Sequence, residues 1–272
     1  MSKLSELKIR TPLYQSDTGE ISYLDFVKAL KKVGLASGDV IFVHSDIAPF
    51  GKLCTFDKTL LLKTLTEAIK ESIGWTGTII MPTFTYSFCK DEVFDPTYSK
   101  STVGVLTEHF RSQPDVVRTN HPIFSVAIWG SQKEIFVDVG KDSFGKHSIF
   151  EKLHHQNAKI VFLGAPFQSC TFLHYVEQIH GIPYRFMKTF RGTVNFSGLQ
   201  HESECTFFVR PLDNNVVFDT SKLERYLLDN NFLRQTNVGN GKVLMVEAKA
   251  LFDKGIQLLD QDIYFFLTKE PT

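Results

Sequence analysis

The sequence lacks closely spaced cysteines, which form disulfides or bind zinc in small domains, and it lacks an excess of basic residues that would attract a polyanion. Its four cysteines lie far apart with no C-x-x-C pair, so we expect reduced thiols and neither a zinc site nor a disulfide framework. Its 30 Lys and Arg residues are balanced by 30 Asp and Glu residues, which argues against a binder of nucleic acid or anionic membranes. No stretch approaches the ~18 uncharged apolar residues of a membrane span, and the first fifteen residues hold no apolar core of signal-peptide length. We therefore expect a cytoplasmic protein.

Several common motifs are also missing. The loop at 44–51 has neither the G-K-[ST] of a P-loop nor G-x-G-x-x-G, and the sequence has no G-x-S-x-G hydrolase motif. There is no H-E-x-x-H, and the adjacent His154 and His155 cannot face the same way on a helix or a strand. We therefore expect no bound metal.

What the sequence does have is enough apolar residues for one large core. It contains 272 residues, 43% of them hydrophobic, and no repeat or low-complexity linker divides it. We therefore expect a single domain over 1–272.

Strand-like and helix-like segments alternate along the chain. The expected strands are 39–43, 78–83, 125–129, 159–163 and 243–246. The expected helices are 23–33, 56–72, 104–110, 171–180 and 249–259. Beyond Met187, alternating runs such as TFRGTVNF and CTFFVR predict an antiparallel section. The fold class is therefore α/β, with three α/β/α layers, a central mixed sheet and an added antiparallel β-section in the C-terminal half.

The loop at 44–51 (HSDIAPFG) follows a strand and leads into a helix. Free backbone N–H groups and the helix dipole can receive a phosphate in such a position. The same residues fit an ordinary polar crossover loop equally well.

The most informative stretch is LGAPFQSCTFLHYVE at 163–177. Thr171 or Ser169 can cap a helix that carries His174 in its first turn, where the helix dipole helps to keep the ring neutral, as a general base requires. Glu177 lies three residues later on the same face and is a candidate to orient the ring. The pair also fits a partly buried histidine that bonds to the cap and an idle acidic residue near the start of the helix.

Cys170 offers a different chemistry, because a cysteine near a helix N-terminus can have a depressed pKa and act as a nucleophile. Most such cysteines are buried and pack as small apolar side chains, and we prefer this interpretation for Cys170.

Three more polar loops are candidates to line a cleft. PTFTYSFCKDEVFDP at 82–96 contains Asp95, STVG at 101–104 precedes a helix, and RTNHP at 118–122 contains His121. Each also fits a simple connector.

Six segments, taken in order, resemble the antibiotic N-acetyltransferases typified by the aminoglycoside 3-N-acetyltransferases. They are GDVIFVHSDIAPFG, then GTIIMPTFTYSF with FDP, STVGVLTEHFR, VVRTNHPIFSVAIWG, KIVFLGA followed by TFLHYVE, and NVGNGKVLMVEAKALFD. They span about 38–253, and their common order makes the resemblance specific.

The resemblance implies an N-acyltransferase that moves an acetyl group from acetyl-CoA to a primary amine of an amino sugar. His174, in the family's T-x-x-H-x-x-E pattern, would be the general base of a direct transfer without an acetyl-cysteine. The cofactor contacts would fall among His44, Ser45, Phe50, Gly51, Thr83, Ser101, Val103, Gly104 and Ser125.

One departure from the family pattern bears on the substrate. Aminoglycoside-modifying members are expected to carry a second glutamate at the place where this sequence has Arg191. A cation there would repel a polycationic drug, so we expect a nucleotide-linked amino sugar of surface polysaccharide synthesis. Asp95, His121, Arg185 and Arg191 are the candidate substrate contacts, with the two arginines as phosphate partners.

Two alternatives stay open. An aminoglycoside 3-N-acetyltransferase that confers antibiotic resistance would use the same site on a cationic drug, and a non-catalytic CoA or sugar-nucleotide binding module would bind without acetylating. The 25 phenylalanines leave a homo-oligomer open, although most phenylalanines lie in cores.

Overall fold

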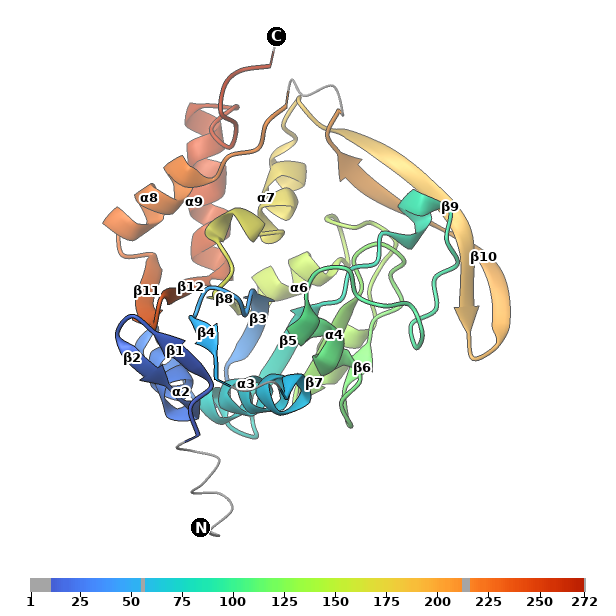
Figure 1. The fold of residues 1–272 in the computed structure, drawn as a ribbon. Coiled ribbons are helices and arrows are strands. Elements are labelled where there is room, and N and C mark those ends of the chain that lie inside the picture. The colour runs from blue at the N-terminus through green and yellow to red at the C-terminus, as the bar shows by residue number, and fades with distance from the viewer. Residues whose placement is uncertain (1–10, 55–56, 212–215, 272) are drawn as a thin grey trace.

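The computed structural model describes residues 11–54, 57–211 and 216–271, and within them the fold is organised around a seven-stranded sheet (Figure 1). The strand order is β11-β12-β8-β3-β5-β7-β6. The strands are β3 (Val40–Ser45), β5 (Thr78–Pro82), β6 (Val117–Arg118), β7 (Val126–Gly130), β8 (Lys159–Leu163), β11 (Leu233–Val238) and β12 (Gly241–Glu247).

The sheet is mixed, as predicted. Strand β3 pairs in parallel with both β5 and β8, whereas β7, β6, β12 and β11 join antiparallel on the two sides. The three parallel strands therefore lie together at the centre and end at the same edge of the sheet. The five strands expected from the sequence correspond to β3, β5, β7, β8 and β12, with ends that differ by at most two residues.

Helices cover both faces, which confirms the predicted three layers. Alternating side chains divide the core, so that Ile41 and Val43 of β3 face one cluster while Phe42 faces the other. One face is covered by α2 (Tyr23–Lys32), α3 (Lys58–Ile73) and α4 (Val105–Arg111). The other is covered by α5 (Lys133–Val137), α6 (Ile149–His155), α7 (Phe172–His180), α8 (Ser221–Asp229) and α9 (Ala248–Gln261).

Local capping explains where α2 begins. The carboxylate of Asp25 accepts hydrogen bonds from the backbone N–H of Ser22 (2.8 Å) and from its hydroxyl (2.7 Å). The buried stripe of this helix contains Phe26, Val27, Ala29 and Leu30. Helix α3 starts two residues later than the expected 56, and residue 56 itself lies outside the described residues.

Two smaller sheets complete the fold. Strands β1 (Tyr14–Ser16), β2 (Gly19–Ile21) and β4 (Lys52–Leu53) pair antiparallel near α2, and sequence analysis did not anticipate them. The expected antiparallel section is confirmed as a hairpin of β9 (Phe186–Phe196) and β10 (Leu199–Val209), which extends away from the central sheet (Figure 1). Helix α8 and strand β11 were also not expected.

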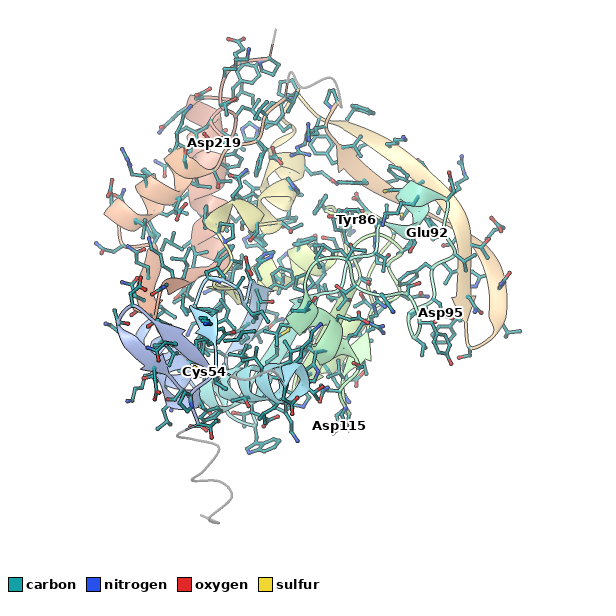
Figure 2. All side chains as sticks on the ribbon, in the orientation of Figure 1. Cys54, Tyr86, Glu92, Asp95, Asp115 and Asp219 are labelled. Carbon is teal, nitrogen blue, oxygen red and sulfur yellow. The ribbon has the colours of Figure 1, made fainter. Side chains whose placement is uncertain are left out.

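The segment between β5 and α4 runs along this hairpin. It contains the 3-10 helix η1 (Ser87–Lys90), and the backbone N–H of Phe94 donates to the carbonyl of Thr193 in β9 (3.0 Å). Figure 2 shows Glu92 and Asp95 on this segment beside the hairpin. No helix in the described part of the chain is long and apolar enough to cross a membrane.

Candidate active site

A cavity of about 220 Å³ lies where the three parallel strands end. His44 and Ser45 at the end of β3 line it together with Pro82 of β5 and with Ala165, which follows β8. Open α/β sheets place their ligands at this edge, where neighbouring connections leave on opposite faces of the sheet. The loops that close the cavity contribute Phe84, Tyr86, Val103, Ser169 and Thr171.

Two buried polar groups of β3 have no hydrogen-bond partner among the described residues. They are the Nε2 of His44 and the Oγ of Ser45. The His44 ring stacks on Phe162, with centroids 5.2 Å apart, and burial lowers its pKa to about 3, so the ring is neutral. Unsatisfied buried polar groups that line a cavity indicate a place where a polar ligand binds.

A second, more open hollow of about 500 Å³ adjoins this cavity through the loop at 101–104. Ser101 and Gly104 line the hollow, while Val103 lines the 220 Å³ cavity. Gly104 has φ +145°, and a Cβ there would lie 3.6 Å from the carbonyl oxygen of Ser45. The two hollows thus lie on either side of one short loop. The start of α3 (Lys58, Leu62) and α4 form the far wall of the larger hollow.

His174 and Glu177 lie together on α7, one helical turn apart. The Nδ1 of His174 is 2.7 Å from the Oε2 of Glu177. The helix predicted over 171–180 is confirmed, but the expected cap is not, because the side chain of Thr171 makes no capping hydrogen bond. Thr171, the residue before α7, lines the 220 Å³ cavity, and His174 lies three residues after it.

Glu177 is fully buried and has three partners. Besides His174, the hydroxyl of Tyr184 donates to its Oε1 (2.9 Å), and the Nε of Arg185 lies 2.9 Å from its Oε2 in an ion pair without hydrogen-bond geometry. Burial alone would raise the pKa of Glu177. The interactions with His174, Arg185 and Tyr184 outweigh burial and hold this pKa below its usual range, so the carboxylate is ionised.

These contacts define the protonation of His174. An ionised carboxylate can only accept hydrogen bonds, so Nδ1 carries the proton and Nε2 carries the lone pair. Burial and, second to it, the positive charge of Arg185 lower the pKa of His174. The side chain retains 22% exposure, and Phe144 and Phe218 contact the ring at centroid distances of 5.4 and 5.2 Å. The site therefore holds a neutral, oriented and accessible imidazole.

Three residues expected to contact a cofactor are packed inside the protein instead. Phe50 is fully buried against Tyr14 and Phe26, because its loop folds under the β1–β2–β4 sheet that sequence analysis missed. Thr83 and Ser125 are fully buried and hydrogen-bond to each other's backbone. The structure shows packing contacts at these three positions, and their contact with a cofactor stays a prediction.

Arg118 explains the burial of Thr83 and Ser125. Its Nε contacts both hydroxyls at 3.1 and 3.2 Å, and its other nitrogens bond to the carbonyls of Thr83, Pro96 and Ser99. This guanidinium ties the strand end to the segment that leads to the hairpin. Sequence analysis did not single it out.

Gly51 lies beside β1, where a Cβ would meet the carbonyl oxygen of Gln15 at 2.5 Å. Of the nine expected cofactor contacts, five line the two hollows: His44, Ser45, Ser101, Val103 and Gly104.

The expected substrate residues are dispersed. The ring of His121 is buried, its Nδ1 accepts from the backbone N–H groups of Ile123 and Phe124, and burial lowers its pKa to about 4. Asp95 caps the turn after it and accepts from the side chain of Asn195 (3.0 Å). Arg191 is exposed on β9, 3.2 Å from Glu204. Only Arg185 lies at the His174 site, and Glu177 engages it there.

Cys170 does not have the environment of a nucleophile. Its side chain is 1% exposed, and burial raises its pKa to about 12. Within the described residues, no group of three or more His, Cys, Asp or Glu side chains could hold a metal ion.

Sequence comparisons point to one family. A family model described as aminoglycoside 3-N-acetyltransferase matches residues 42–260. The aminoglycoside N(3)-acetyltransferase IV of Salmonella sp is 25% identical over 248 residues, covering 89% of each chain. An aminoglycoside N(3')-acetyltransferase-like protein of Bacillus subtilis (strain 168), YokD, is 27% identical over 180 residues, 57% of this chain and 64% of that protein.

The fold comparison agrees with the sequence comparisons. The solved structure of AAC-IIIb with CoASH superposes with a TM-score of 0.77 and 25% identity, over 92% of this chain and 98% of that one. The likeness therefore includes both halves of the chain and the region around the two hollows.

Proposed function

The chain belongs to the aminoglycoside 3-N-acetyltransferase family, and from this premise we propose that it transfers an acetyl group from acetyl-CoA to a primary amine of an amino sugar, with His174 as the general base. The observation that carries the proposal is the neutral imidazole that Glu177 holds by Nδ1. It lies on α7, three residues after Thr171, which lines the 220 Å³ cavity. We further infer that 1–272 acts as one domain, since the family match reaches from β3 to α9.

The residues around the two hollows fit acetyl-CoA. The larger hollow has room for an extended chain beside Lys58 and Ser101, and the loop at 103–104 leads from it to Ser45 and His44. The buried Oγ of Ser45 has no partner within the described parts of the chain, and its hydroxyl can donate to a carbonyl oxygen of the ligand. When bound, the thioester supplies the activated acetyl group.

His174 moves the proton in this mechanism. Its Nε2 would accept the proton of the substrate amine as the N–C bond to the acetyl group forms, and the Glu177 carboxylate would stabilise the imidazolium. The C–S bond of the thioester would break, and the imidazolium proton would pass to the CoA thiolate that leaves, so that CoA–SH and the N-acetylated amine are the products. Arg185 and Tyr184 hold that carboxylate in place. The buried thiol of Cys170 takes no part, which supports direct transfer over a covalent acetyl-cysteine.

The acceptor proposed here is an aminoglycoside-type amine. The expectation of a nucleotide-linked amino sugar depended on Arg185 and Arg191 as phosphate partners. Arg191 pairs with Glu204 on the exposed hairpin, and Arg185 is buried against Glu177. The names of the relatives also favour the aminoglycoside alternative.

A thioester-consumption assay tests the acceptor. We expect CoA release with aminoglycosides, and lower rates with free and nucleotide-linked amino sugars at the same amine concentration. Turnover of nucleotide-linked sugars alone would reverse the assignment. Tight binding of acetyl-CoA without acetylation of any amine would show a binding module.

The pH dependence of kcat/KM tests the state of His174. Because burial and Arg185 lower its pKa, we expect the rate to fall only as the pH drops through a value below the usual His pKa of about 6.5. Arg185→Met removes the positive charge, so this acidic limb should shift to higher pH, with the ring's ¹⁵N NMR titration shifting in parallel. An unchanged limb in Arg185→Met would contradict the assigned base.

A further inference from the structure

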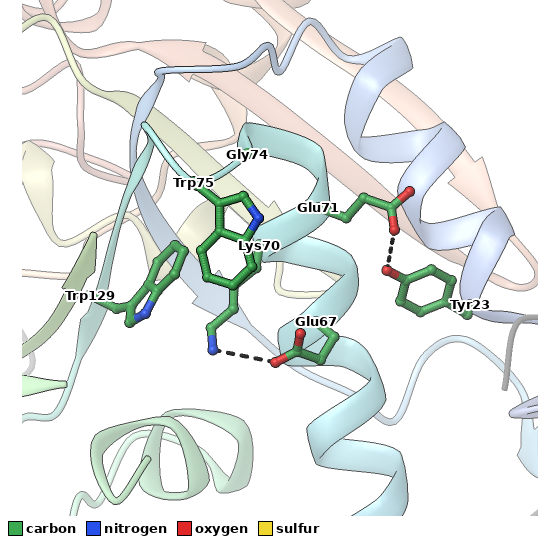
Figure 3. A pocket seen from close by; sticks show the side chains of 7 residues that line it. All are labelled: Tyr23, Glu67, Lys70, Glu71, Gly74, Trp75 and Trp129. Atoms are coloured by element: carbon green, nitrogen blue, oxygen red, sulfur yellow. Dashed lines mark hydrogen bonds and ion pairs between the residues drawn. The ribbon is translucent and has the colours of Figure 1, made fainter. Parts of the chain in front are cut away.

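A separate pocket lies at the opposite end of the sheet from the candidate active site. It has a volume of about 350 Å³ and is lined by the last turns of α3, by Trp75 after that helix, by Trp129 of β7 and by Tyr23 (Figure 3). Trp129 pairs with Ile79 near the start of β5, whereas the 220 Å³ cavity lies at the end of the same strand. The two sites share no lining residue.

Two indole rings form the apolar walls of this pocket. The ring centroids of Trp75 and Trp129 are 5.9 Å apart with an interplanar angle of 56°. Trp129 is 8% exposed, but Trp75 is 85% exposed, so its face is open to a ligand. A large aromatic side chain left in water at the rim of a hollow loses the burial that normally stabilises it.

The charged residues of the pocket favour a cation. Glu67 and Glu71 project from α3, and the C-terminal end of this helix adds the negative end of its dipole. Among the described residues that line the pocket, Lys70 carries the one positive charge against the two carboxylates of Glu67 and Glu71. The hydroxyl of Tyr23 donates to Glu71 and fixes that carboxylate at the rim.

Lys70 shows how the pocket holds an ammonium group. Its Nζ lies 4.9 Å from the centroid of the Trp129 ring and 3.3 Å from Glu67. A cation over an indole face and beside a carboxylate gains both cation–π and ionic attraction. The chain's own ammonium group uses Trp129 and Glu67, while the ring of Trp75 lies next to the Lys70 side chain and the carboxylate of Glu71 points toward Tyr23 (Figure 3).

We propose that this pocket, defined by Tyr23, Glu67, Lys70, Glu71, Gly74, Trp75 and Trp129, is a second binding site for a small organic ammonium ion. The ligand places its carbon skeleton on Trp75 and its positive charge between the indoles and the carboxylates. An amino sugar and a quaternary alkylammonium share this chemistry. The proposal is independent of the acetyl-transfer function.

Intrinsic fluorescence offers a direct test, because Trp75 and Trp129 are the only two tryptophans in the chain. The full chain is titrated at constant ionic strength with glucosamine, with choline and with neutral glucose, at a pH where the amine of glucosamine is protonated. We expect a saturable change in emission with glucosamine, choline or both, and none with glucose. The same response should persist in His174→Ala, which separates this pocket from the catalytic site.

Three variants identify the groups responsible. Trp75→Ala, with Trp129 as the remaining reporter, and the double variant Glu67→Gln/Glu71→Gln should each weaken binding about tenfold. Lys70→Met removes the internal competitor and should tighten binding several-fold. Asp229→Asn, which removes one exposed carboxylate on α8, is the control for a charge change outside the pocket and should change nothing.

Two results would overturn the proposal. One is the absence of a saturable response to either ammonium ion in both the wild type and Lys70→Met. The other is a response to glucose equal to that to glucosamine, which would indicate a neutral sugar site. Neither result bears on acetyl transfer, which Trp75→Ala should leave unchanged.

Discussion

Replacing His174 with alanine is expected to lower kcat of acetyl transfer by about two to four orders of magnitude, the usual contribution of a general base. The imidazole is held by Glu177 with Nε2 free of hydrogen bonds to the described residues, so its loss removes the proton acceptor without disturbing the two hollows. The measurement is steady-state CoA release, together with the Kd for acetyl-CoA, which should stay near the wild-type value.

A matched control is His155→Ala, which removes an exposed histidine from the end of α6. Its kcat should equal that of the wild type. Near-normal turnover in His174→Ala would show that another group accepts the proton and would contradict the assigned base.

Replacing Glu177 with methionine is expected to damage both stability and catalysis. The carboxylate is fully buried and bonds to His174, Tyr184 and Arg185, so its removal leaves a buried guanidinium without its partner. Breaking a buried ion pair in this way typically costs about 3–5 kcal/mol of the free energy of unfolding. The ring of His174 also loses the acceptor that fixes its tautomer. Urea denaturation and kcat measure the two effects separately.

The double variant Glu177→Met/Arg185→Met separates packing from chemistry. Replacing both members of a buried pair with apolar side chains of similar volume is often neutral for stability. We therefore expect most of the lost free energy of unfolding to return, while kcat stays low because His174 is still unsupported. Recovery of wild-type kcat in the double variant would show that Glu177 acts only as a structural residue.

The central strands and the helices that pack on them could be predicted because their signals are local and long enough to repeat. Strand β8 has four consecutive apolar residues, and α2 begins at the Ser22 and Asp25 capping pair. The missed strands β1, β2 and β4 have two or three residues each, which is shorter than any period that a pattern can display. Helix α8 was not predicted, although its buried Leu223 and Leu227 recur at helical spacing.

In the candidate site, too, the residues related by local spacing could be predicted and those brought together by tertiary contacts could not. His174 and Glu177 could be paired from the sequence because their i, i+3 spacing on one helix fixes their proximity. Tyr184 and Arg185 reach Glu177 from the connection after α7, where no periodic spacing relates them to His174. Phe50, Thr83 and Ser125 were expected to contact the cofactor because of the family resemblance. Tertiary contacts with Tyr14 and Arg118 bury them, and such contacts cannot be predicted from the neighbouring residues in the sequence.

The most direct test of the proton transfer is a crystal structure of the wild-type chain with CoA and an unreactive amine acceptor. The account predicts the acceptor nitrogen within about 2.6–3.2 Å of His174 Nε2, with Nδ1 still bonded to Glu177. An acceptor nitrogen seated against a different base, with His174 facing away from it, would contradict the account.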